Sequence, residues 1–302
     1  MDTFKRIPGL IAIIMLVALV LLGVSTVSAQ SDMEKVVKQF TDQSVIGYIQ
    51  PIADMFGANM NSGYFHTAAI EQSGFHLSFD MIGMATMLSD GQKTYTATAP
   101  PGFNPATFQT ATMFGGKGAV VTDAATGLSY RGSDGVFNTQ VFPLAVPQLT
   151  LGNLYGTQVL IRYIPIPKMD NFPNVTLWGI GARHSISQYL PDVPVDLAAG
   201  IFYSSFTVGD FINYKGLAIN GEASMSWSIL TVYSGLQWEK SSMDLSYVSQ
   251  DVSHTSVSVT MDGANTFRFI LGVGLGLGPL KIFGDANFGS MTTFSAGFGF
   301  GG

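Results

Sequence analysis

The sequence contains no cysteine among its 302 residues. Disulfide bonds are therefore excluded, and so is the lipid-modified cysteine that anchors a lipoprotein. Charged residues make up only 11% of the chain, against about 25% in ordinary soluble domains. Because a water-soluble surface needs more charge, this composition favours a protein that lies in a membrane. The formal net charge of -6 also leaves no basic footprint for binding nucleic acid.

The chain has little of the residue patterning that catalysis requires. Its four histidines show neither H-x-x-x-H nor H-E-x-x-H spacing, so no sequence signal for a metal site is present. The sequence has no P-loop and no G-x-S-x-G motif, and the glycines from Gly272 to Gly278 alternate with the period of a strand. His184 beside Ser185 resembles the membrane phospholipase family only in that pairing, because the H-x-S-N-G run is missing. The sequence predicts that the protein is not an enzyme and holds no cofactor or metal.

Long apolar runs are also absent after the N-terminus, where no stretch reaches the ~20 residues that a membrane-spanning helix needs. The N-terminus has basic Lys5 and Arg6, an apolar stretch over 10–24, and small residues at 27–29. These are the parts of a signal peptide, and we expect cleavage after Ala29. An uncleaved anchor is the alternative, although 10–24 is short for a spanning helix. An exported chain without a spanning helix enters a membrane only as a closed barrel.

Strict alternation is the strongest positive pattern in the sequence. From Phe267 to Phe300, apolar side chains occupy almost every second position, and small or polar residues lie between them. Such strands have one face for lipid and one face for a polar or glycine-lined interior. Further candidate strands follow one another from about residue 149, including 229–239 and 243–260, which we expect to be joined by a turn at 239–242.

This pattern predicts an all-β fold, an antiparallel transmembrane β-barrel of about 10–14 strands with a short N-terminal helical segment. A secreted β-sandwich would show the same alternation, with its apolar faces buried between two sheets. The low charge content disfavours that alternative.

The pattern divides the chain into three parts: a signal peptide over 1–29, an N-terminal helical segment over 30–72, and the barrel over 73–302. Within the N-terminal segment the apolar spacing predicts a helix that Pro51 ends or kinks. This segment either inserts into the lumen as a plug or packs on the barrel rim. The barrel includes a long excursion at about 93–148, which is a lid, a lumen constriction or a set of further wall strands.

Polar and charged side chains fall on the face opposite the apolar one, and we expect the barrel interior to be lined by Asp80, Arg162, Asp196, Glu222, Arg268, Lys281 and Asp285. In a narrow barrel such residues mostly pair with one another and fill the interior. The alternative is that some of them line a permeation path. Sequence spacing does not separate these two possibilities.

Several stretches resemble a known group of proteins: Pro51-Ile52-Ala53-Asp54-Met55-Phe56-Gly57 continuing to Ala68, Pro147 to Gly152, Arg162 to Pro165, and Gly284 to Gly289. They are similar to an uncharacterised family of outer-membrane barrels from Bacteroidetes-type bacteria, and more distantly to FadL-type hydrophobic-compound transporters and PorV-like barrels. The resemblance implies an N-terminal segment that blocks the lumen and a wall that lets hydrophobic molecules leave sideways. One departure is that Phe300 is followed by Gly301-Gly302, whereas outer-membrane barrels usually end on an aromatic residue.

Together these observations predict a barrel in the outer membrane of a Gram-negative bacterium that passively transports a small hydrophobic solute. The alternative is a non-transporting barrel with a structural, assembly or surface-attachment role. The expected partners are outer-membrane lipids, a hydrophobic small molecule and the outer-membrane assembly machinery, with no nucleic acid.

Overall fold

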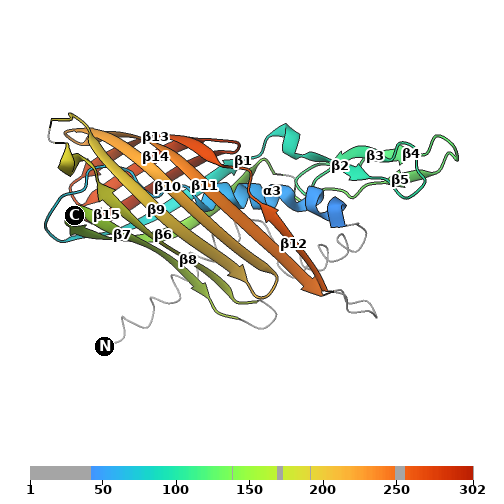
Figure 1. Ribbon diagram of the computed structural model, residues 1–302, viewed down its shortest axis with the longest axis horizontal. Coiled ribbons are helices and arrows are strands. Elements are labelled where there is room, and N and C mark those ends of the chain that lie inside the picture. The colour runs from blue at the N-terminus through green and yellow to red at the C-terminus, as the bar shows by residue number, and fades with distance from the viewer. Residues whose placement is uncertain (1–41, 138, 169–172, 191, 249–255, 302) are drawn as a thin grey trace.

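The computed structural model describes residues 42–137, 139–168, 173–190, 192–248 and 256–301. Ten antiparallel strands close into a barrel (Figure 1). They are β1 (His76–Met87), β6 (Val141–Leu154), β7 (Thr157–Ile166), β8 (Val175–Ser185), β9 (Asp196–Val208), β10 (Ile212–Trp227), β11 (Leu230–Val248), β13 (Phe267–Leu277), β14 (Leu280–Phe288) and β15 (Thr292–Gly301). The first wall strand pairs with the last, and β10 pairs with β11, so no edge remains between them. The predicted all-β barrel is confirmed.

Strand β11 is longer than the sequence pattern indicated. It runs unbroken through 239–242, where we expected a turn, so that expectation is wrong. The reason is that Glu239 and Ser241 continue the inward-facing series while Lys240 faces out. The first part of β11 pairs with β13, and its second part pairs with β12 (Ser256–Asp262). The predicted break near Asp251 lies outside the described residues.

The two ends of the barrel differ in the length of their connections. At one end, which we call the short-turn end, links at 155–156, 228–229 and 278–279 and a longer one at 186–195 join neighbouring strands, and the C-terminus lies there (Figure 1). We call the opposite end the long-loop end. At the other end, residues 88–140 form an excursion that contains η2 (Asp90–Gln92) and the strands β2 (Thr94–Thr98), β3 (Thr107–Ala111), β4 (Val120–Thr122) and β5 (Ser129–Arg131). These strands form two separate hairpins that project away from the barrel.

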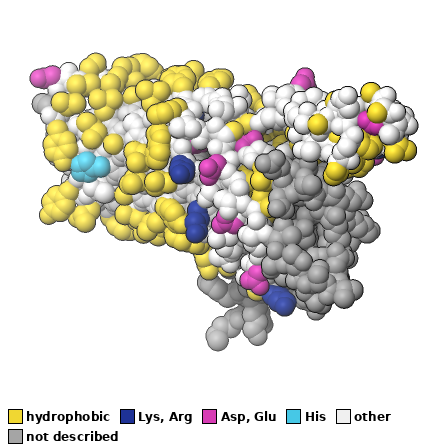
Figure 2. Space-filling model, turned by 45° about the vertical axis from the view of Figure 1, so that its right-hand side comes forward, with side chains coloured by type: hydrophobic (Ala, Val, Ile, Leu, Met, Phe, Trp, Pro, Cys, Tyr) yellow, Lys and Arg dark blue, Asp and Glu magenta, His cyan; other side chains and the backbone are white. Residues whose placement is uncertain are grey.

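The outside of the barrel carries an apolar band. Phe267 is 69% exposed, whereas Arg268 beside it is 2% exposed, as the alternation predicts. Figure 2 shows hydrophobic side chains covering much of the barrel surface at the end opposite the excursion. On the wall, the outward-facing Lys215 and Lys240 lie on adjacent strands, β10 and β11. From Lys215 and Lys240, β10 and β11 continue to the long-loop end of the barrel. Helix α3 (Asp42–Met60) begins at that end.

Helix α3 enters the barrel from the long-loop end and contacts β1, β6, β11, β12 and β15. Pro51 lies inside the helix and does not end it. An interior proline costs about 3 kcal/mol, and here the burial of neighbouring Tyr48, Ile49 and Ala53 offsets that cost. Any start of the predicted helix before Asp42 lies outside the described residues. None of the described helices is long and apolar enough to cross a membrane.

The chain passes through the barrel first as the last turns of α3 and then, from residue 61, as a stretch without helix or strand. We call residues 55–70 the interior segment. Its middle is almost free of solvent contact, with Asn59, Met60 and Asn61 at 0% exposure. The segment then leads into β1 through residues 71–75 at the short-turn end. The barrel interior is therefore filled by the chain that precedes its own first strand.

Candidate functional site

The structure buries five of the seven residues that we expected to line the interior: Asp80, Arg162, Glu222, Arg268 and Asp285. Asp196, at the start of β9, and Lys281, near the start of β14, are half-buried. The buried residues come from separate strands, and three arginines connect most of them to the interior segment. Two of these arginines, Arg162 and Arg268, were among the predicted residues, whereas the third, Arg183, was not.

Arg162 on β7 holds the end of helix α3. Its Nη1 donates to the carbonyl oxygen of Met60 at 3.2 Å, and its Nη2 donates to those of Ser62 at 3.0 Å and Gly63 at 2.8 Å. Its Nε donates to Oε1 of Gln148, the residue directly opposite on β6, at 3.0 Å. The last carbonyls of a helix have no partner within the helix and carry partial negative charge. Since α3 has no basic residue in its last turn, the wall supplies the positive charge there.

Arg183 on β8 forms an ion pair with Glu222 on β10, and both side chains are almost completely buried. Its Nε donates to Oε1 and Oε2 of Glu222 at 3.1 and 3.0 Å. The pair reaches across β9, where the buried Ala198 and Gly200 leave room. Arg183 also donates to the carbonyl oxygen of Thr67 in the interior segment. This arginine thus joins two wall strands and the segment between them.

Arg268 on β13 forms the second buried ion pair, with Nη2 2.6 Å from Oε1 of Glu239 on β11. The same Nη2 donates to the carbonyl oxygen of Ala58 at 3.0 Å. Beside it, Gln237 donates to the carbonyl oxygen of Asn61 at 2.7 Å. All three buried arginines therefore hydrogen-bond to the backbone of the interior segment, which anchors it along its length.

Three consecutive aromatic residues of the interior segment dock on three different wall strands. The ring of Tyr64 stacks on Phe202 of β9, with ring centroids 4.0 Å apart. Phe65 makes an edge-to-face contact with Tyr233 of β11 at 5.7 Å. His66 stacks on Phe283 of β14 at 4.4 Å. The three rings therefore contact three separate strands of the wall.

Glycines on the wall make room for these rings. A Cβ atom on Gly235 would lie 2.8 Å from Cζ of Phe65, and one on Gly181 would lie 2.2 Å from Cδ1 of Phe202. A Cβ on Gly272 would lie 2.2 Å from Cζ of Tyr233. The inward-facing glycines of the sequence pattern therefore serve to accept aromatic side chains.

Asp80 on β1 lies opposite Gln148 of β6, the wall partner of Arg162, but no hydrogen bond joins it to these networks. It is 1% exposed, and neither of its carboxylate oxygens makes a hydrogen bond within the described part of the chain. Asp285, by contrast, accepts a hydrogen bond from the hydroxyl of Tyr233 at 3.0 Å. A buried carboxylate without hydrogen bonds is unusual, because burial of an unpaired charge is costly.

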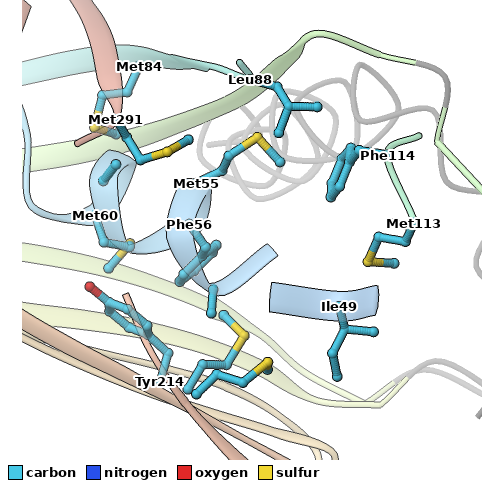
Figure 3. Packing of buried hydrophobic residues seen from close by; sticks show 14 of the residues in the cluster. Ile49, Met55, Phe56, Met60, Met84, Leu88, Met113, Phe114, Tyr214 and Met291 are labelled. Carbon is cyan, nitrogen blue, oxygen red and sulfur yellow. The ribbon is translucent and has the colours of Figure 1, made fainter. Parts of the chain in front are cut away.

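The mouth of the barrel around α3 is lined by a methionine-rich apolar cluster (Figure 3). Its buried methionines are Met55, Met60, Met84, Met113, Met243, Met261 and Met291. Phe56 packs at its centre, 4.7 Å from Phe206 and 4.9 Å from Tyr214 between ring centroids. Methionine is flexible and polarizable, and its clusters adapt to differently shaped apolar partners.

Two spaces at the barrel wall differ in size. A space of about 10 Å³ lies between Tyr64, Arg162, Gly179 and Phe202 in the interior. A groove of about 530 Å³ lies at the short-turn end, lined by Phe75, Leu154, Tyr155 and their neighbours. Since Phe75 and Leu154 are among the most exposed apolar residues, this groove opens to the outside of the barrel. The space of about 10 Å³ beside Tyr64 has no room for a solute.

A comparison with family models gives one match, which covers residues 5–302 and is described as a family of unknown function (DUF6588). The chain belongs to the DUF6588 family. No functionally curated protein matches it.

Several solved structures are similar to this DUF6588 chain at low identity. They include a loop L8 deletion mutant of OmpT of Vibrio cholerae, at 10% identity and TM-score 0.27, covering 77% of this chain and 100% of that one. The toluene transporter TbuX of Ralstonia pickettii is 8% identical with TM-score 0.29, covering 78% and 91%. Ail of Yersinia pestis is 10% identical with TM-score 0.20, covering 75% and 99%. At these scores we base no argument on them.

In the DUF6588 chain, the His184 and Ser185 pair gives no support to a hydrolase. Ser185 is buried and faces inward, whereas His184 faces the outer side of β8. There its ring nitrogens contact Thr157 Oγ1 at 2.8 Å and the hydroxyl of Tyr189 at 3.0 Å. Neighbouring residues of a strand point to opposite faces, so the two side chains cannot act together. Among the described residues, no group of acidic and histidine side chains has metal-binding geometry.

The DUF6588 sequence contained a signal for Arg183 that the prediction missed. Trp178 and Ile180 face outward on β8. Because successive side chains of a strand point to opposite faces, this predicts that Arg183 faces inward. Gln148, Gln158 and Gln237 also face inward and join the network. Uncharged glutamines do not stand out in a search for charged residues, although they are hydrogen-bond partners of the arginines.

Proposed function

We propose that this chain is a barrel of the Gram-negative outer membrane that lets a small hydrophobic solute pass, with the interior segment as its gate. The membrane location is supported by the closed barrel and by its apolar exterior. It is also supported by the signal-peptide pattern of residues 1–29. Outer-membrane lipids would contact the exposed band, and the assembly machinery remains a predicted partner. The resemblance to FadL-type and PorV-like barrels likewise remains a prediction.

The observation that carries the gating proposal is the way the interior segment is held. The wall arginines bind its backbone carbonyls at Ala58, Met60, Ser62, Gly63 and Thr67. A narrow barrel can fill its interior with wall side chains alone. In this protein the interior segment fills the barrel, and its hydrogen bonds to the wall can be exchanged for hydrogen bonds to water. Removal of the interior segment would leave a passage lined by Arg162, Arg183 and Arg268.

The direction of passage follows from the two ends of the barrel. Outer-membrane barrels have short periplasmic turns and longer extracellular loops. By this rule the long-loop end, with the excursion and the methionine-rich cluster, faces the outside of the cell. The methionine-rich cluster is buried around α3, so an apolar solute would reach this adaptable apolar region once α3 shifts, and the interior segment would block its further path.

A disulfide lock tests this gate. The hydroxyl of Thr67 in the interior segment lies 3.2 Å from that of Ser224 on β10, which brings cysteines at these positions within reach of a disulfide. Since the chain has no cysteine, the T67C/S224C variant would form this single bond. We expect intact Gram-negative cells that express it to take up the hydrophobic dye N-phenyl-1-naphthylamine faster after mild reduction than before.

The single variant T67C, treated in the same way, is the matched control and should show no change on reduction. Equal dye uptake in the oxidised and reduced double variant, with wild-type uptake above that of cells without the barrel, would show that solute bypasses the segment. That result would contradict the gate.

A second candidate function is a non-transporting structural or attachment barrel. The observation that favours it is the sealing of the interior by the ion pairs Arg183–Glu222 and Arg268–Glu239. This candidate predicts dye uptake no faster than in cells without the barrel, both for the wild type and for the reduced double variant.

A further inference from the structure

The wall of the barrel forms a flat slot that the ring of Tyr64 occupies. One face of the ring stacks on Phe202, with centroids 4.0 Å apart and planes at 6°. The guanidinium carbon of Arg162 lies over the ring, 4.2 Å from its centroid. Gly179, Gly181 and Leu160 complete the lining. Both ring-contacting side chains belong to the wall: Phe202 packs against wall glycines, and Arg162 bonds Gln148 of β6 as well as the interior segment.

The glycines make the slot specific for a planar group. Beside Phe202, a Cβ on Gly181 would lie 2.2 Å from Cδ1 of its ring, and a Cβ on Gly200 would lie 2.7 Å from Cζ. Phe202 can therefore lie flat against β8 and present its face to the lumen. A stacked aromatic partner gains about 0.5–1.5 kcal/mol beyond the burial of its area, which a puckered aliphatic ring would not gain.

The charge of Arg162 distinguishes it from the other two buried arginines. Arg183 and Arg268 each have a carboxylate partner on the wall, Glu222 and Glu239. Among the described residues, Arg162 has no such ion pair, and its acceptors are Gln148 and three carbonyls of the interior segment. When the segment withdraws, Arg162 keeps only Gln148 as a hydrogen-bond partner. Asp80 on β1 lies opposite Gln148, on the far side of β6, and makes no ion pair with Arg162. An anionic solute would therefore supply the paired, hydrogen-bonded charge that Arg162 then lacks.

We propose that this slot binds a small aromatic carboxylate as the transported solute. Its ring takes the place of the Tyr64 ring against Phe202, and its carboxylate takes the place of the segment's carbonyls at Arg162. Tyr64 thus acts as an internal substitute for the solute while the gate is closed. This inference rests on the proposed function and adds the solute class to it.

A flux measurement with full-length mature protein in phospholipid vesicles at pH 8 tests the proposal. Benzoate has the ring and the charge, cyclohexanecarboxylate has the charge alone, and benzyl alcohol has the ring alone. After subtraction of flux into protein-free vesicles, we expect benzoate to enter at least about ten times faster than cyclohexanecarboxylate. The Phe202→Leu variant should bring this ratio close to one.

The Arg162→Gln variant should remove the preference for benzoate over benzyl alcohol. Arg131→Gln, on the exposed β5 of the excursion, is the matched control and should keep it. Equal rates for benzoate and cyclohexanecarboxylate in the wild type would show that the slot does not select a planar ring. Equal rates for benzoate and benzyl alcohol would show that the solute charge is not needed at Arg162, as expected if Asp80 turns to neutralise it. Either result would overturn this inference and leave the gate intact. No protein-dependent flux of any of the three compounds, together with no dye uptake, would overturn the proposed function and this inference with it.

The ring position can be tested without transport. Tyr64→Ala removes the ring and leaves Phe202 and Arg162 in place. We expect p-cresol to raise the unfolding temperature of the Tyr64→Ala barrel and not that of the wild type, and cyclohexanol to have no such effect. Equal effects of p-cresol and cyclohexanol on the folded variant would show that the slot does not select a planar ring, and would overturn the proposal.

Discussion

At the scale of single residues, the barrel interior depends on charges that are buried and paired. Arg183 and Glu222 are 39 positions apart in the sequence and meet across β9. Taking two charges out of water is costly, and their attraction offsets this cost only when hydrogen bonds complete the shell. Here Gln158 and the carbonyl of Thr67 supply the other partners of Arg183.

Breaking this pair should destabilise the barrel strongly. We expect Arg183→Met to lower the free energy of unfolding by about 3–5 kcal/mol, because Glu222 is left as an unpaired buried charge. The double variant R183M/E222M should lose less than the single variant, since no charge remains. Urea unfolding of the refolded barrel, followed by gel mobility without heating, measures these two variants and the second single variant, Glu222→Met. A double variant whose loss equals the sum of the two single losses would show that the pair is not coupled.

The face of a strand on which a side chain lies could be predicted from the sequence wherever apolar and polar residues alternate strictly. Arg268, between Phe267 and Phe269, was expected to face inward, and it is 2% exposed. The same rule was not applied to Arg183, because small Gly179, Gly181 and Ala182 blur the contrast between the two faces of β8. The pairing of Arg183 with Glu222 could not be predicted at all, since it depends on which strands become neighbours and on the small residues of β9 between them.

At the scale of elements, the sequence pattern predicted the helix and the wall strands better than their limits. α3 passes through Pro51 because packing inside the barrel outweighs the lost hydrogen bond. β11 continues through 239–242 because the inward positions remain polar and small there. In both cases contacts with other elements decided the outcome, and local propensity did not.

The fit between β8, β9 and the interior segment gives a prediction at this scale. Gly181→Ala would place a Cβ 2.2 Å from the Phe202 ring and should displace the Tyr64 stack. We expect a loss of about 1–3 kcal/mol in unfolding free energy, as for other overpacked sites. Gly221→Ala is the matched control, since nothing lies within 4 Å of its Cβ position. If both variants unfold at the same urea concentration, the close packing of the slot is not important for stability.

At the scale of the whole molecule, the barrel and the segment that fills it come from one continuous chain. Alternation and low charge content predicted the closed barrel, and the N-terminal helix was expected as either a plug or a rim element. The choice between these two needed the structure, because the wall arginines hold the segment through its backbone carbonyls. Carbonyl groups are the same in every sequence, so no residue pattern could reveal these contacts.

The most direct test of the account is single-channel conductance in planar lipid bilayers. It compares the complete mature chain with a chain that begins at Glu71, just before β1, and lacks the interior segment. The account predicts long silent periods for the complete chain and stable conductance steps for the shortened one. Equal conductance from both, or no conductance from a shortened chain that has inserted as a barrel, would contradict the claim that this segment closes the passage.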